Sequence, residues 1–423
     1  MSGLNKTLGL PMLIFYGTGM ILGAGIYSII GKASFETGET LWLGFAFAGV
    51  SAFLTALSYA ELCTMFPKAG AEFIYLREAF KKDKWIGSTA GIAMAFSGAA
   101  TAATVALSFS AYLNQFIESP QFITALSVLF VFSCVAIIGI RTSGWVTVVS
   151  TLIEIGGLIF IIYLGLTSDK FGNALETIPH LGTISGSALI IFSFFGFENI
   201  ANLAEETKNP GRDLPRAILI SVTIATVLYV LVSISALSLL SSENLANSKA
   251  PLMSVAKTVS EKYSKILGAV ALFSTANTAL ISLIGASRIL YSMGDTGVLP
   301  KFTAVISKKR KTPWIASIII FTTSVMLLPL GKLETVASVS SLTTLIAFLL
   351  VNIALVVLRY KKPSLGRSFK VPLTIGKTPI LPVLAALITV LLLTQFQIKV
   401  YLIGISFLAL ACLGFWLHDR KHI

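Results

Sequence analysis

The sequence predicts an all-α polytopic membrane protein with twelve transmembrane helices, and two observations predict this class. Of its 423 residues, 55% are hydrophobic and only 12% are charged, whereas a soluble domain carries roughly 25% charged residues. In addition, apolar stretches of about 20 residues recur along the chain, and each is long enough to cross the hydrocarbon core of a bilayer.

Apolar runs bounded by charged or turn residues define the twelve predicted spans. They comprise residues 8–31, 39–66, 85–117, 121–140, 144–167, 183–204, 214–241, 262–294, 312–331, 335–358, 378–397 and 399–417. The first run is too long for the apolar core of a signal peptide, so we expect it to remain as a span. We predict a single transmembrane domain over residues 1–423.

The distribution of lysine and arginine predicts the orientation of the chain. With the N-terminus inside, the inner segments hold 24 of the 32 lysines and arginines, and the outer loops hold 8. Because positive residues favour the cytoplasmic side, both termini are predicted to be cytoplasmic, with the protein in the cell membrane. The net charge of +13 then reflects this bias and contact with anionic membrane lipids, not nucleic-acid binding.

The sequence offers few residues for metal binding or catalysis. Its three cysteines lie in apolar segments without a common spacing, and its three histidines lie in a loop and at the C-terminal end. We therefore expect no metal site, no cofactor and no enzyme active site. A P-loop is also missing, so direct ATP hydrolysis is not expected.

Two of the spans are interrupted by glycine. The first contains four glycines within GTGMILGAGIYS (17–28), and in the sixth Gly196 follows SFF, with Glu198 two residues later. Gly25 and Gly196 are five spans apart, so two consecutive five-helix blocks would enter the membrane from opposite sides. Paired interrupted helices in an inverted repeat are typical of secondary transporters. For span 1 the alternative is that Gly19-x-x-x-Gly23 only allows close helix packing.

An interrupted helix predicts a particular kind of ligand. It frees backbone N–H and C=O groups, which a membrane tolerates only where they line a cavity or bind something. Freed N–H groups at a half-helix N-terminus suit a carboxylate, and freed carbonyls suit an ammonium or a metal cation. A pair of such helices therefore predicts a zwitterionic substrate, an α-amino acid.

Three motifs resemble the amino acid–polyamine–organocation (APC) superfamily of transporters. YAELCTMFPKAGAEFIYLREAF (59–80) resembles the end of its second helix and its first inner loop. FSFFGFENIANLAEETKNPGRDLPRAI (192–218) resembles its sixth helix, and GAGIY in span 1 agrees in order and spacing. The resemblance implies the leucine-transporter-type fold, a 5+5 inverted repeat with broken helices 1 and 6 plus two peripheral helices. The repeats would cover residues 8–167 and 183–358, and the peripheral helices residues 378–417.

The resemblance also implies the substrate contacts on span 1. The backbone N–H groups around Gly23, Ala24 and Gly25 would hold the substrate carboxylate. Ile21 would line the pocket just before them.

On span 6 the resemblance implies that the backbone of Phe192, Ser193 and Phe195 holds the substrate amino group. The two phenylalanine rings would gate the site, the alternative being that they are ordinary packing residues. Glu198 would begin the second half-helix and link gating to the proton or substrate state.

Glu154 lies inside span 5 with apolar residues on both sides. A single carboxylate in mid-membrane is costly and is commonly functional. We favour a coupling proton on Glu154, because burial in a low dielectric favours the neutral carboxyl. Alternatively, Glu154 holds a cation such as sodium together with Ser274, Thr275, Asn277 or Thr278 on span 8, since hard ions prefer oxygen ligands. A third alternative is a structural carboxyl group bonded to hydroxyl partners.

Charged residues near the inner ends of spans 2 and 6 suggest an ion-pair gate, the alternative being a solvated loop surface. The candidates are Glu61, Glu205, Glu206, Lys68, Arg77, Arg212 and Arg216.

These observations predict a secondary active amino acid transporter that works by alternating access. Neutral substrates are favoured, because the expected pocket residues are small or apolar. Further pocket candidates on span 3 are Met94, Ser97 and Ala99. Proton coupling is favoured over sodium coupling. The alternatives are an exchanger or exporter of amino acids or amines, a sodium-coupled symporter, and a membrane sensor of amino acids. A monomer and a homodimer both remain open.

Overall fold

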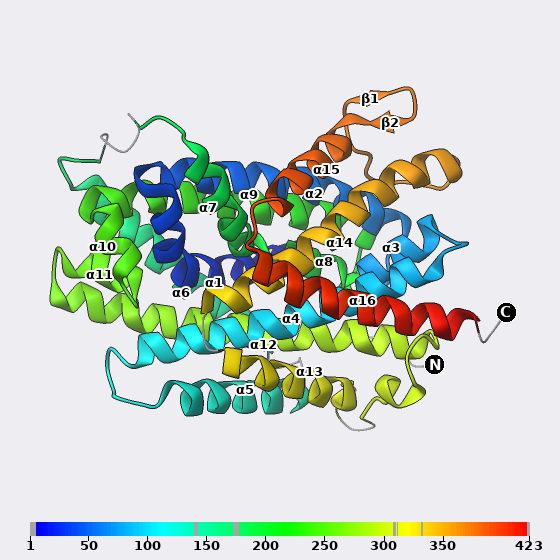
Figure 1. Cartoon of the computed structure of the whole chain (residues 1–423), viewed down its shortest axis with the longest axis horizontal. Coiled ribbons are helices and arrows are strands. Elements are labelled where there is room, and N and C mark those ends of the chain that lie inside the picture. Colours follow the sequence, from blue (N-terminus) through cyan, green and yellow to red (C-terminus); the bar gives the residue numbers. More distant parts are fainter. Residues whose placement is uncertain are drawn as a thin grey trace.

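The computed structural model describes residues 6–138, 143–171, 177–307, 310, 312–330 and 333–420. Almost all of its regular structure is helical (Figure 1). The long helices are α1 (Leu10–Thr37), α2 (Leu41–Met65), α4 (Lys84–Leu113), α5 (Gln121–Ile138), α6 (Ser143–Leu166), α9 (Pro210–Leu239), α12 (Glu261–Asp295), α14 (Leu333–Lys361) and α16 (Ile398–Arg420). The shorter helices are α3 (Ala71–Ala79), α7 (Leu181–Ile190), α8 (Phe197–Ala201), α10 (Ser242–Asn247), α11 (Pro251–Lys257), α13 (Trp314–Leu327) and α15 (Ile380–Leu393).

Short 3-10 helices and one hairpin complete the described secondary structure. The 3-10 helices are η1 (Gly38–Thr40), η3 (Ile191–Phe194), η4 (Ala204–Glu206), η5 (Lys301–Ala304) and η6 (Leu328–Leu330). The antiparallel strands β1 (Thr374–Ile375) and β2 (Thr378–Pro379) form the hairpin between α14 and α15.

Each predicted span coincides with one or more helices. By length and composition, eight helical segments of the described chain can cross a membrane, or up to nine if α15 and the first part of α16, bent by 115°, form one span. One of the eight, Leu10–Met65, contains both α1 and α2, and α13 is a shorter apolar helix of 14 residues. The architecture is that of an all-α, multi-pass membrane protein, whereas the division into twelve spans stays a prediction.

The helices pack in two groups. In the first, α1, α2, α9 and the α7–α8 segment contact one another, and in the second α4, α5, α12 and α13 do so. The helix α4 lies along α12, and α2 lies along α9 (Figure 1). In both pairs the partners are five predicted spans apart, as two five-helix repeats would place them. The inverted relation between the repeats stays a prediction.

The predicted break in the first span is wrong for this structure. The helix α1 continues from Leu10 to Thr37 through all four glycines. A Cβ atom on Gly23 would lie 1.7 Å from Thr278 Oγ1, and one on Gly25 would lie 2.3 Å from Ser193 Cα. The glycines therefore serve the alternative role of close packing, because only a hydrogen atom fits between α1 and its neighbours.

Hydroxyl groups of surrounding helices also bind the α1 backbone. Tyr112 Oη donates to the carbonyl of Tyr27 at 2.9 Å, and Ser274 Oγ donates to the carbonyl of Gly23. A carbonyl oxygen has two lone pairs, so it can accept such a bond while it remains in a helix. The prediction that backbone N–H groups around Gly23, Ala24 and Gly25 are freed for a substrate carboxylate therefore loses its basis, because α1 is continuous there.

The predicted break in the sixth span is present. The helix α7 ends at Ile190, the 3-10 turn η3 follows, and α8 begins only at Phe197. Phe195 is extended, with φ −66° and ψ 142°, and Gly196 has φ 130°. Residues with a Cβ atom rarely adopt that φ, so the break requires glycine.

We expect Gly25→Ala to destabilise the protein, because its Cβ would collide with the backbone of Ser193 and overpacking costs about 1–3 kcal/mol. The control is Gly156→Ala in α6, where a Cβ would meet no atom within 4 Å. The thermal unfolding midpoint of the purified protein should fall for the first variant and stay level or rise for the second. Equal midpoints would show that the contact between α1 and η3 is not tight.

Candidate functional site

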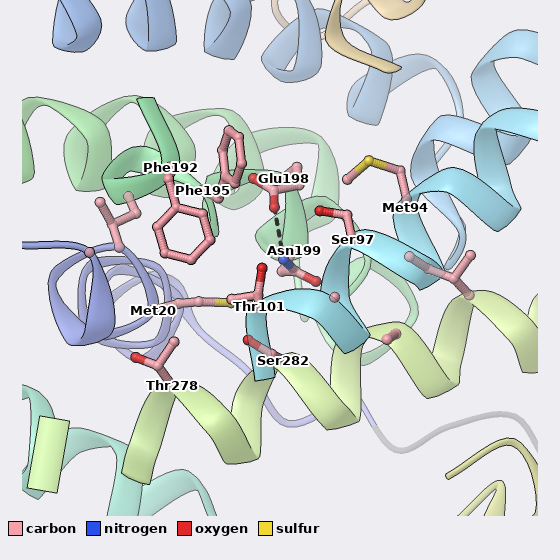
Figure 2. A pocket seen from close by; sticks show the side chains of 15 residues that line it. Met20, Met94, Ser97, Thr101, Phe192, Phe195, Glu198, Asn199, Thr278 and Ser282 are labelled. Carbon is pink, nitrogen blue, oxygen red and sulfur yellow. Dashed lines mark hydrogen bonds between the residues drawn. The ribbon is translucent and has the colours of Figure 1, made fainter. Parts of the chain in front are cut away.

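A cavity with about 530 Å³ of space not filled by atoms lies where the break in the sixth span faces α1, α4 and α12. Figure 2 shows the side chains that line it. The lining residues are Met20, Ile21, Gly25, Met94, Ser97, Gly98, Thr101, Phe192, Phe195, Glu198, Asn199, Thr278, Ser282, Ala286 and Ile289.

The break supplies an aromatic wall. The ring centroids of Phe192 and Phe195 are 5.8 Å apart in an edge-to-face arrangement, and Phe195 makes a second such contact with Phe348 of α14. The extended backbone at Phe195 allows its ring to point toward the cavity while Phe194, its neighbour, packs on Tyr229 behind it. Both predicted ring residues therefore line the cavity.

Glu198 is the single carboxylate among the lining residues. One oxygen accepts a hydrogen bond from the backbone N–H of Gly196 at 2.8 Å. The other accepts a hydrogen bond from Asn199 Nδ2 at 3.1 Å, drawn as the dashed line in Figure 2. The side chain is buried, and no ion pair to it occurs among the described residues. It is therefore a buried carboxyl group at the cavity wall whose charge no described cation compensates, so either a proton or a ligand cation can neutralise it.

Two hydroxyl groups lie on the α12 wall, on the far side of the cavity from Glu198 in Figure 2. Thr278 and Ser282 are four residues apart, so both face the cavity from one side of the helix. Each is buried and has no hydrogen-bond partner in the described part of the chain. Buried polar groups normally have a partner, so these two hydroxyls are available to a ligand.

Hydroxyl groups also join α4 to α14 beside the cavity. Ser97 Oγ lies 2.5 Å from Thr344 Oγ1 and 2.8 Å from Ser340 Oγ, and Thr101 Oγ1 lies 3.1 Å from Ser340 Oγ. Of the candidates on span 3, Met94 and Ser97 line the cavity, whereas Ala99 is buried and does not.

Some of the remaining substrate candidates line the cavity, and others lie behind its wall. Ile21 and Gly25 line the cavity, but Gly23 and Ser193 do not. Ser193 lies against Gly25, and Tyr229 Oη is within hydrogen-bonding distance of the carbonyls of both Ile21 (2.5 Å) and Ser193 (3.0 Å). Ala24 belongs to α1, and its side chain lies outside the described part of the structure.

A second buried group, the Glu154 cluster, consists of Glu154 on α6 with Ser274, Asn277 and Thr278 on α12. Asn277 Nδ2 donates to Glu154 Oε1 at 3.1 Å, and Oε2 has no partner among the described residues. Ser274 donates to the carbonyl of Gly23, and Thr278 both packs on Gly23 and lines the cavity. Glu154 thus contacts α12 through Asn277, whereas Ser274 and Thr278 of the same helix contact Gly23 of α1, and Thr278 also lines the cavity.

The charged residues near the helix ends pair differently from the sequence prediction. Glu61 is buried and pairs with Arg359 and Arg367, and Glu206 pairs with Arg288 at 2.9 Å. Neither carboxylate therefore belongs to a solvated loop surface. The predicted partners Lys68, Arg77, Arg212 and Arg216 do not form these pairs, because the chain brings α12 and the end of α14 closer.

Among the polar lining residues, sequence reasoning missed Thr101, Asn199 and Ser282. The signal for two of them was present, since Thr101 and Ser282 each lie four residues after a candidate hydroxyl residue, Ser97 and Thr278, and so share its helix face. For Asn199 no such signal existed, because its place depends on the turn at Gly196.

Comparisons with known proteins agree with this architecture. The amino acid permease family pattern matches residues 8–417. The chain is 26% identical to the branched-chain amino acid permease BcaP of Bacillus subtilis, over 99% of this chain and 94% of that protein. It is 30% identical to cationic amino acid transporter 5 of Arabidopsis thaliana, over 82% of this chain and 64% of that protein. It is 28% identical to the vacuolar cationic amino acid transporter 8 of the same plant, over 82% of this chain and 62% of that protein.

The chain thus spans nearly the whole bacterial permease but less than two thirds of these plant transporters. The predicted resemblance to the APC superfamily is confirmed, since the family match covers almost every residue. The chain belongs to the amino acid permease family.

Proposed function

We propose that this protein is a secondary active transporter for neutral amino acids, working by alternating access, with the cavity at the break of the sixth span as its substrate site. The observation that carries the proposal is the distribution of polar groups in the cavity. Glu198, a carboxylate with no cationic partner among the described residues, lies across from Thr278 and Ser282, two hydroxyls that have no hydrogen-bond partner there either. This arrangement complements an α-amino acid, whose ammonium would meet Glu198 and whose carboxylate would meet the hydroxyls.

The apolar lining supports a neutral substrate side chain. The rings of Phe192 and Phe195 and the side chains of Met20, Ile21 and Met94 face the same cavity. If Glu198 holds the α-ammonium, the lining offers no second carboxylate for a cationic side chain. The bacterial relative is named a branched-chain amino acid permease, which supports the same class of substrate.

Cationic amino acids are the second candidate, because several relatives are named as their transporters. In that case Glu198 would bind the substrate side chain, and the α-ammonium would bind backbone carbonyls at the helix break. An exchanger of amino acids would use the same site. The direction of transport would then depend on the substrate gradients alone.

We further propose that Glu154 carries the coupling proton. A charged carboxylate buried without a cationic partner is costly in free energy, so a proton or a metal cation is needed to neutralise it. Asn277 is its single hydrogen-bond partner among the described residues. The contact of Thr278 with both Gly23 and the cavity gives a short route between the Glu154 cluster and the substrate.

Uptake into proteoliposomes tests the substrate class. Under an imposed proton gradient we expect labelled leucine to accumulate. Unlabelled isoleucine and valine should inhibit this uptake, whereas arginine and lysine should not, because the lining is apolar. Accumulation of arginine in preference to leucine would replace the neutral assignment with the cationic one.

The double substitution Thr278→Val with Ser282→Ala tests the carboxylate contacts. It removes two hydrogen bonds to a charged group, each of which contributes about 1.5–3 kcal/mol, so KM for leucine should rise at least about tenfold. Inhibition by the decarboxylated amine of leucine should change little, since this analogue lacks the carboxylate.

The matched control for these contacts is Thr275→Val on the same helix, whose hydroxyl bonds the α12 backbone instead of lining the cavity. A similar rise in KM for the control, or weaker inhibition by the amine as well, would contradict the assigned role.

For Glu154→Gln we expect that proton-driven accumulation is lost while exchange with preloaded amino acid is retained, because the neutral amide cannot carry a proton. The control Glu118→Gln removes an exposed carboxylate outside the helices and should retain both activities. Accumulation of substrate with a sodium gradient alone would assign Glu154 to a cation site instead.

A further inference from the structure

A buried ion-pair network joins α2 to the segment that follows α14. The carboxylate of Glu61 lies 2.8 Å from Arg359 Nε and 3.0 Å from Arg367 Nε, and it accepts the backbone N–H of Val371 at 2.8 Å. All three charged side chains are nearly inaccessible to solvent, at 0%, 5% and 9% exposed. One carboxylate thus faces two guanidinium groups, and one positive charge remains unbalanced.

A cavity opens beside this network, with about 350 Å³ of space not filled by atoms. Its lining residues are Arg359, Pro363, Arg367, Lys370, Gly376 and Lys377. Residues 359–377 contain six lysines and arginines and no acidic residue. Glu61, which pairs with Arg359 and Arg367, and Glu78, which pairs with Lys362, do not line this cavity. The cavity is therefore cationic overall.

The four cationic side chains of the cavity differ in whether their N–H donors already have partners in the protein. Arg359 binds Glu61, and the terminal nitrogens of Arg367 bind backbone carbonyls of Pro363, Leu365 and Lys362. Lys370 and Lys377 are exposed and form no ion pair among the described residues. The arginines thus supply a fixed positive field, and the lysines supply the donors that remain available to a ligand.

Exposed apolar side chains flank the cations. Leu373 is 65% exposed and Ile375 is 72% exposed, and the β1–β2 hairpin that they belong to or border projects clear of the helices (Figure 1). Leu373 also has a left-handed backbone, with φ 56°, and is the one described non-glycine residue with positive φ. Lysines beside exposed apolar side chains are typical of protein segments at the membrane–water boundary, where apolar groups enter the lipid and cations meet headgroups.

We propose that this cavity binds the phosphate group of an anionic phospholipid. Lys370 and Lys377 contact the phosphate, the unbalanced charge of the Arg359–Glu61–Arg367 network attracts it, and Leu373 and Ile375 lie in the adjoining lipid. Basic pockets next to transmembrane helices suit phosphate headgroups. A soluble phosphate would meet the same lysines, but the exposed apolar flank favours the lipid as the source.

Lipid binding to the purified full chain in detergent tests the site. Native mass spectrometry would measure the affinity for a phosphatidylglycerol and for a phosphatidylcholine with the same acyl chains. The variant is Lys370→Gln with Lys377→Gln. The matched control is Lys82→Gln with Lys84→Gln, which removes two exposed lysines before and at the start of α4. We expect phosphatidylglycerol affinity to fall about tenfold in the first variant and to change little in the control.

A second measurement separates the two sources of phosphate, by repeating the titration with millimolar inorganic phosphate present. Selective loss of phosphatidylglycerol binding in the first variant, with no displacement by inorganic phosphate, supports the lipid site. Displacement of the lipid by inorganic phosphate would overturn the lipid as the source and assign the lysines to a soluble anion. Equal affinities of the two variants, or equal binding of both lipids to the unchanged protein, would overturn the site itself.

Discussion

A helix that stops in mid-span leaves backbone N–H and C=O groups that lipid cannot satisfy, and the α7–α8 segment stops in this way at Phe195 and Gly196. The left-handed conformation of Gly196 turns the chain so that Glu198 accepts the N–H of Gly196 and faces the cavity. The same turn directs the Phe195 ring toward Phe192. The charge, the aromatic wall and the free volume of the proposed substrate site all follow from this one backbone constraint.

The helix α1 connects this site with the Glu154 cluster. Gly25 brings it against Ser193 of the break, and Gly23, two residues earlier, brings it against Thr278 of α12. Both contacts are too close for a Cβ atom, so nearby positions of α1 touch the break and α12. This shared contact gives a physical basis for the proposed linkage between substrate and coupling ion.

Glu61, Glu206, Glu154 and Glu198 fall into two classes according to their partners. Glu61 and Glu206 pair with arginines, which compensates their charge and ties separate segments together. Glu154 and Glu198 have amide or backbone partners and no ion pair among the described residues. A buried charge without a counter-charge is costly, so the second class is where a proton, a cation or a substrate ammonium is expected to bind.

Sequence patterns correctly predicted the membrane class, the place of each long apolar helix and the break at Gly196, and they pointed to Glu154 and Glu198, the buried acidic residues of the proposed sites. These features follow from apolar length, glycine at a backbone position that needs it, and the cost of charge in lipid, all of which are local properties. The same local signal was misleading for α1, because glycine serves a broken helix and a tightly packed helix equally well. The packing of the folded chain distinguishes the two roles, because it brings Ser193 and Thr278 within contact distance of the glycines. It likewise decided the partners of Glu61 and Glu206, since ion pairs between segments far apart in the chain depend on how the helices pack.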